Sequence, residues 1–210
     1  MSRLHSGARA CISRDVSDAN DPYVYPDTSV LRNRLGITDP DFLNKQERAL
    51  VALRSRRGIP RGSFDLAHLR AIHRHLFQDV YDWAGELRTV EISKGRQQFQ
   101  FRQYIQTGMA DVHRRLVRMR FLEGLTTPDF AEQAAVIVGD INYIHPFREG
   151  NGRTQLHYLK QLAQQAGHRL DLARIEGDRW IEASISSHET EYGPMARIIA
   201  DALSGPVRGR

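Results

Sequence analysis

The chain has 210 residues, of which 40% are hydrophobic, and its 30 lysines and arginines outnumber its 25 aspartates and glutamates. This length suits one globular domain, and the ordinary composition excludes a wholly disordered chain. No apolar run approaches the roughly 18 residues that a transmembrane helix needs. The N-terminus lacks the apolar stretch of a secretory signal, and the single cysteine, Cys11, excludes an internal disulfide. The sequence therefore predicts a cytoplasmic protein that does not enter a membrane, and it leaves open export by a route without an N-terminal signal.

The basic residues are almost all arginines, with only Lys45, Lys94 and Lys160 as lysines. A coding bias explains this excess. Anion binding explains it equally well, because the guanidinium fork suits phosphates. Net charge alone does not distinguish a nucleic acid from a nucleotide or an acidic protein partner.

The N-terminal half begins with a polar arm over residues 1–20 that carries no pattern, and we predict it to be mobile. An extended or turn segment follows, because prolines bias their predecessors away from helix, and a short helix is predicted from about Thr28. Apolar residues at helical spacing predict longer helices over 39–56 and 64–80. Alternating apolar residues from Thr89 to Phe101 predict a small β-hairpin, which must lean on the helices because two strands alone are marginally stable.

The C-terminal half shows helical spacing throughout, which predicts helices over 105–121, 128–144, 151–166, 178–188 and 194–203. The helix over 128–144 is the most apolar, so we predict that it forms the core. The helix over 105–121 carries four arginines, which indicate either a solvated face or a nucleic-acid contact. The whole is predicted to be an all-α domain over 21–203 with one small β-hairpin, followed by a tail over 204–210.

The segment from His145 to Arg153 reads His-Pro-Phe-Arg-Glu-Gly-Asn-Gly-Arg. A turn with two glycines leads into a new helix, whose free N–H groups and dipole favour an anion. Asn151 and Arg153 can donate to phosphates, Glu149 can seat Mg²⁺ beside them, and His145 can take a proton at neutral pH. These features predict nucleotidyl or phosphoryl transfer to a hydroxyl. The alternative is a helix–loop–helix whose glycines only form the corner.

This segment resembles the Fic domain signature His-x-Phe-x-Asp/Glu-Gly-Asn-Gly-Arg-x-x-Arg at seven specified positions. The likeness extends upstream through the lead-in from Tyr23 to Asn33 and through the hairpin, which the family uses as a flap. The resemblance implies an all-α Fic-type fold and an enzyme that moves AMP from ATP to a Ser, Thr or Tyr hydroxyl of a target protein. Gly152, where the kinase-like branch carries lysine, favours AMP transfer over phosphate transfer.

The resemblance also implies a role for each matched residue. His145 is the general base, Phe147 anchors the loop, Glu149 holds Mg²⁺, and Arg153 stabilises the β-phosphate. The remaining nucleotide-binding residues that it implies are Gly150, Asn151, Gly152, Lys94, Gly95, Arg32 and Asn33. The hairpin, with Val90, Ile92 and Phe99, is implied to register the target's backbone by β-augmentation.

Leu156 stands where the family carries its second arginine. This leucine supports an alternative, a Fic-fold binding module with weakened catalysis. The family's inhibitory motif, Ser/Thr-x-x-x-Glu-Gly/Asn, does not occur in the sequence, which favours a toxin restrained by a separate small antitoxin with its own inhibitory glutamate. By resemblance, a type II topoisomerase subunit is a plausible target. A nucleic-acid binder is a third hypothesis, but no aromatic platform or recognition-helix motif supports it.

Overall fold

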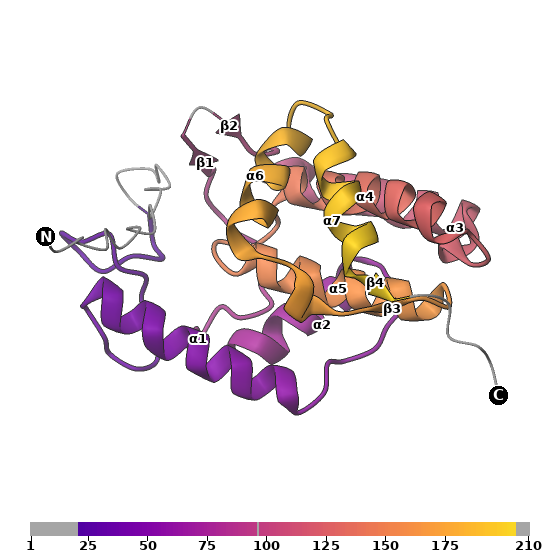
Figure 1. Ribbon diagram of the computed structural model, residues 1–210. Helices are drawn as coiled ribbons and strands as arrows, with labels where there is room; N and C mark the ends of the chain where they lie inside the picture. The colour runs from indigo at the N-terminus through magenta and orange to yellow at the C-terminus, as the bar shows by residue number, and fades with distance from the viewer. Residues whose placement is uncertain (1–20, 96, 205–210) are drawn as a thin grey trace, which may run out of the picture.

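The computed structural model describes residues 21–95 and 97–204, so the predicted N-terminal arm and residues 205–210 of the predicted tail lie outside the described residues. The helices are α1 (Pro40–Arg56), α2 (Leu66–Phe77), α3 (Ile105–Arg118), α4 (Thr127–Ile144), α5 (Asn151–Gln165), α6 (Gly177–Ser187) and α7 (Gly193–Ala202). Short strands are β1 (Ser93–Lys94), β2 (Gln97–Gln98), β3 (Arg169–Leu170) and β4 (Leu203–Ser204), and 3₁₀ turns are η1 (Arg102–Tyr104), η2 (Arg120–Leu122) and η3 (Leu172–Arg174). The predicted α-helical fold is confirmed (Figure 1).

Helix α4 forms the centre of the domain and packs against α3, α5, α6 and α7. Its most deeply buried side chains are at most 1% exposed, and they are Phe130, Ala131, Ala134, Ala135, Ile137, Val138 and Ile141. Glu132, Gln133 and Tyr143 are exposed on the remaining side, so a wide apolar stripe faces the core and a narrow side meets solvent. The Thr126 hydroxyl accepts a hydrogen bond from the Asp129 N–H and caps the start of the helix. The prediction of a core helix here is therefore confirmed.

Helices α1 and α2 form a second layer, in which α2 lies between α1 and α5 (Figure 1). Aspartates cap both helices, because Asp39 accepts from the Phe42 N–H at 2.7 Å and Asp65 from the His68 N–H at 2.8 Å. Helix α2 ends at Phe77, three residues before the predicted end, and the N–H groups of Val80 and Tyr81 both turn back to the Phe77 carbonyl. None of the helices in these ranges is long and apolar enough to cross a membrane.

The short helix predicted near Thr28 is wrong. Val24 and Leu31 form an antiparallel bridge, and the Arg32 N–H donates to the Tyr23 carbonyl at 2.7 Å. The Thr28 hydroxyl accepts from the Val30 N–H at 3.1 Å, a local bond that competes with helix formation. The first turn of a helix is costly in conformational entropy, so a stretch this short forms a turn, which its side-chain hydrogen bonds stabilise.

Two short antiparallel sheets accompany the helices. The predicted hairpin exists, but its ladder joins only Ser93 to Gln98 and Lys94 to Gln97. The pairing of β3 with β4 was not predicted, and it fixes Leu203 beside Leu170 at the end of the described chain. Residues this far apart in sequence leave no local pairing signal.

Candidate active site

The turn between α4 and α5 presents free backbone N–H groups. The first intrahelical bond of α5 runs from the Thr154 N–H to the Gly150 carbonyl, so the N–H groups of Asn151, Gly152 and Arg153 have no acceptor inside the helix. No hydrogen bond from these three groups to another described residue is present either. They lie at the positive end of the helix dipole, which is the predicted anion site.

Asn151 and Gly150 give this turn its shape. The Asn151 side chain accepts from the Phe147 N–H at 3.0 Å and donates to the Phe147 carbonyl at 2.7 Å, and the residue is 3% exposed. These two bonds hold the Asn151 side chain on the turn, and its backbone N–H is among the unpaired groups, so the predicted phosphate contact stays a prediction. Gly150 has φ +81°, and a Cβ there would lie 2.4 Å from the Phe77 ring, so the position requires glycine.

His145 lies at the end of α4 with φ 47° and ψ 64°, in the left-handed region. Its Nδ1 lies 3.1 Å from the Asn142 carbonyl, which can only accept, so Nδ1 carries the hydrogen and Nε2 keeps a lone pair. The ring stacks on Phe99 with the centroids 3.8 Å apart. Burial, followed by the positive charges of Arg88, His188 and Lys94, lowers the pKa of His145 to about 3. The imidazole is therefore neutral at pH 7, the form that a general base needs.

The Glu149 carboxylate is half-exposed beside the free N–H groups. Its Oε1 accepts from the Gly150 N–H at 2.8 Å, and no described residue donates a hydrogen bond to Oε2. In the described part of the chain, no cluster of three or more His, Cys, Asp or Glu residues could hold a metal alone. One free carboxylate oxygen beside the predicted anion site fits Mg²⁺, which takes few protein ligands and completes its shell with phosphate and water.

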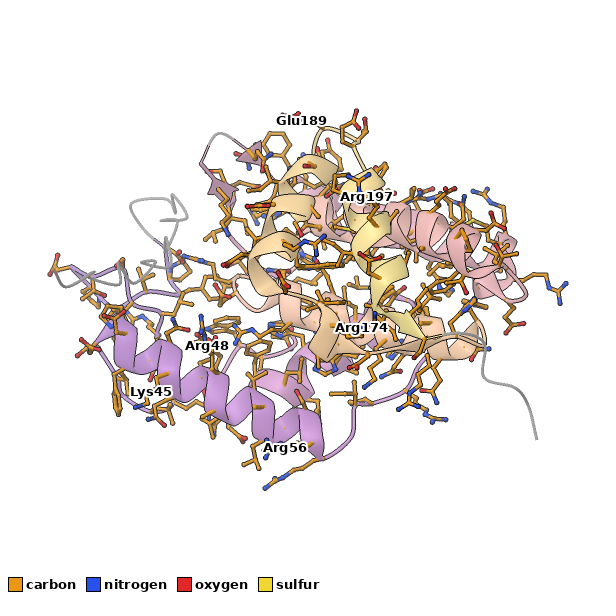
Figure 2. All side chains as sticks on the ribbon, viewed as in Figure 1. Lys45, Arg48, Arg56, Arg174, Glu189 and Arg197 are labelled. Atoms are coloured by element: carbon orange, nitrogen blue, oxygen red, sulfur yellow. The ribbon has the colours of Figure 1, made fainter. Side chains whose placement is uncertain are left out.

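The Arg153 guanidinium contacts side chains of α1 and α2. Its Nη2 donates to Glu47 at 2.5 Å and to Glu149 at 3.4 Å, and its Cζ lies 4.7 Å from the centre of the Phe77 ring. Glu47 is 5% exposed and also accepts from the Tyr81 hydroxyl. In contrast, Lys45 and Arg56 extend from the outer side of α1 (Figure 2). Glu47 was not predicted from the sequence, and it fixes one edge of the guanidinium while the other N–H groups stay available.

The flap, residues 89–101, lies against His145 rather than apart from it. Val90, Ile92 and Phe99 are at most 8% exposed and pack together with Tyr23 in a small cluster. Their side chains are therefore not available to a target, although pairing along the flap's backbone stays a prediction. Near the tip, Gly95 has φ +61°, and the Lys94 charge reaches His145. The Gln97 side chain donates to the Ile185 carbonyl near the end of α6, at 3.2 Å.

Comparison with known proteins decides the family. The sequence model of the Fic/DOC family matches residues 63–163. The chain is 41% identical over 177 residues to the probable protein adenylyltransferase y4lH of Sinorhizobium fredii, which covers 84% of this chain and 92% of that protein. The chain belongs to the Fic/DOC family.

Other relatives agree with this assignment. The probable protein adenylyltransferase Fic of Escherichia coli is 34% identical, with 92% of this chain and 97% of that protein covered. The solved structure of the BepC protein from Bartonella tribocorum, with bound AMPPNP, superimposes with a TM-score of 0.80 at 28% identity and covers 89% of this chain and 98% of that one. These matches confirm the predicted family and the predicted kind of enzyme.

The side chains of Asn33 and Arg32, both predicted to contact the nucleotide in this Fic/DOC chain, make hydrogen bonds within their own segment. The Asn33 side chain donates to the Leu31 and Ile37 carbonyls and accepts from two N–H groups of its own loop, so it serves the turn. Arg32 is exposed, with its Nε on the Val24 carbonyl at 2.8 Å. The nucleotide contacts of Asn33 and Arg32 both stay predictions.

Leu156 of the Fic/DOC motif lies partly buried against the main hydrophobic core. Arg148 does not replace the missing arginine, because it is buried and its Nε donates to Asp21 at 2.9 Å. In this Fic/DOC chain, Arg153 is thus the motif arginine that remains beside the predicted anion site.

Proposed function

We propose that this Fic/DOC protein is an adenylyltransferase that moves AMP from ATP to a hydroxyl side chain of a target protein. The observation that carries the proposal is the pairing of a neutral His145, whose Nε2 is free, with the unpaired N–H groups at the start of α5 in the same loop. A base and an oxyanion site together serve attack by a hydroxyl on a phosphate. The named adenylyltransferases among the relatives and the nucleotide-bound Fic structures support the same reaction.

In the proposed reaction, the His145 Nε2 takes the proton of the target hydroxyl. The hydroxyl oxygen then forms a bond to the α-phosphorus of ATP, while the bond from that phosphorus to the α,β-bridging oxygen breaks. Pyrophosphate leaves with the electron pair of the broken bond. The proton on His145 passes to solvent after the products leave, which restores the neutral base.

The anion site stabilises the charge that develops during this transfer. The N–H groups of residues 151–153 face phosphate oxygens, and Arg153 uses its remaining N–H groups on the β-phosphate and the departing pyrophosphate. Mg²⁺, held by the free oxygen of Glu149, would neutralise phosphate charge there. Lys94 adds a cation near the tip of the flap. The positive charges of Arg153 and Lys94 thus complement the negative charges of the triphosphate.

The regulatory setting and the place of action are also proposals. A cytoplasmic toxin restrained by a separate antitoxin is supported by the absence of the inhibitory motif from the sequence. An acceptor such as a topoisomerase subunit rests on the family resemblance. The alternative of a binding module with weakened catalysis is favoured by one observation, the partly buried Leu156 in place of an arginine.

ATP labelled at either the α- or the γ-phosphate tests the reaction in a cell extract supplemented with Mg²⁺. Label from the α-phosphate should become covalently attached to protein, and the His145→Ala variant should attach none. His113→Ala, a histidine variant on α3, is the matched control and should keep the activity. Attachment of the γ-label would instead assign phosphate transfer. ATP binding without attachment, even by Leu156→Arg, would assign the binding module.

A further inference from the structure

Arg88, immediately before the flap, has a side chain with no exposed surface. A buried guanidinium is costly unless its N–H groups are satisfied. Its partners come from two separate parts of the chain. It donates to the carbonyls of His145 at 2.8 Å, Val90 at 2.8 Å and Ile144 at 3.4 Å, to that of Gln100 at short range, and to the Glu91 carboxylate at 3.2 Å.

These partners are the end of α4 and both sides of the flap. The last carbonyls of a helix have no partner inside the helix and lie at its negative end. Arg88 satisfies two of them, on Ile144 and His145, with a positive charge. Its own backbone N–H donates to the Pro146 carbonyl at 2.9 Å, and the Gln100 N–H donates to the Tyr143 carbonyl at 3.0 Å. Backbone and side-chain hydrogen bonds therefore join the same two segments, the end of α4 and the base of the flap. We call this contact the seam.

The conformation of His145 depends on this seam. A left-handed backbone costs a non-glycine residue about 1–2 kcal/mol, so it needs surrounding bonds to persist. The His145 N–H donates to the Ile141 carbonyl at 3.0 Å, Nδ1 pairs with Asn142, and the carbonyl accepts from Arg88. The first two bonds lie within α4, whereas Arg88 alone among the described side chains bonds to the backbone of His145.

We propose that Arg88 is a positioning residue that fixes the base of the flap and the catalytic histidine relative to one another. It would set the direction of Nε2 and the place of the flap on which a target strand registers. Among the described residues, Arg88 makes no hydrogen bond to the loop from Glu149 to Arg153, so nucleotide binding is separable from this role. The inference rests on the proposed AMP transfer.

The test compares Arg88→Lys and Arg88→Met with Arg70→Lys. Arg70 is the matched control, because it also donates to a backbone carbonyl, that of Gly85, and to a glutamate, Glu86. Lysine keeps the charge of Arg88, but its three N–H donors on one nitrogen cannot replace the five hydrogen bonds that the guanidinium fork makes from three nitrogens. We expect kcat for AMP transfer to fall about 10- to 100-fold in both Arg88 variants, with MgATP affinity within about threefold of the wild type.

Two results would overturn the proposal. One is wild-type transfer by Arg88→Lys, and the other is a loss of MgATP affinity equal to the loss of transfer, which a general folding defect would give. A second measurement needs no variant and no activity. The Arg88 Nε–H should exchange with solvent at least about 100-fold more slowly than an unprotected guanidinium N–H in the wild-type protein.

Exchange as fast as that of an unprotected guanidinium would contradict the buried bond to His145 even if the variants failed to fold. A wild-type protein that transfers no AMP would instead contradict the proposed function. The two failures are therefore distinguishable.

Discussion

Replacement of Gly150 by alanine tests whether the anion-binding turn is built as described. The new Cβ would lie 2.4, 2.5 and 3.0 Å from three atoms of the buried Phe77 ring, and φ is +81°. The left-handed backbone costs about 1–2 kcal/mol, and overpacking costs about 1–3 kcal/mol more. The sum is about 2–5 kcal/mol of unfolding free energy. Because Phe77 also supports the Arg153 guanidinium, displacement of the ring should weaken ATP binding too.

Gly152→Ala is the matched control, since a Cβ there meets nothing within 4 Å. Urea unfolding of the two variants and the wild type measures the difference, and titration with MgATP measures binding. Gly152→Ala should be within about 1 kcal/mol of the wild type in stability. Gly150→Ala and Gly152→Ala variants of equal stability would refute this geometry of the turn. So would a Gly150→Ala variant as stable as the wild type.

Three further changes have defined outcomes. Glu47→Ala leaves the Arg153 cation without its buried partner, and since Arg153 is partly solvated we expect a loss of about 2–4 kcal/mol in urea unfolding; a loss below about 0.5 kcal/mol would contradict the pairing. Leu156→Arg should raise the rate of AMP transfer about 10-fold, in line with one added charged contact. An unchanged rate would contradict the idea that Leu156 weakens catalysis. Burial lowers the pKa of His73 to about 3, so the unfolded chain binds a proton below pH 6.5 that the folded one does not. Stability should therefore fall by about 2 kcal/mol from this residue between pH 7 and pH 5, and a His73→Gln variant should lack that part of the slope.

The sequence predicted what depends on local pattern. Helical spacing located the helices that contain Leu69, Phe130 and Tyr158, since burial of one face needs that period. The turn from His145 to Arg153 was predicted together with its glycines, because positive φ and a free helix start are local properties. The region near Thr28 was predicted wrongly because three apolar residues at helical spacing do not outweigh turn-forming side chains.

Long-range polar partners could not be predicted in the same way. Glu47 looks like a surface residue of α1, although its spacing from Leu43 and Val51 places it on the buried face. A charged residue on that face was the available signal. Arg88 gave no signal at all, because its acceptors are backbone carbonyls far along the chain. The flap residues Val90, Ile92 and Phe99 alternate as a strand does, but alternation does not say whether a face meets the core or a target.

Mass spectrometry of the modified acceptor tests the central claim most directly. After incubation with ATP and Mg²⁺, a Ser, Thr or Tyr side chain should carry one AMP when the wild-type protein is used and none when His145→Ala is used. An acceptor that carries a single phosphate, or one modified equally by the His145→Ala variant, would contradict the account.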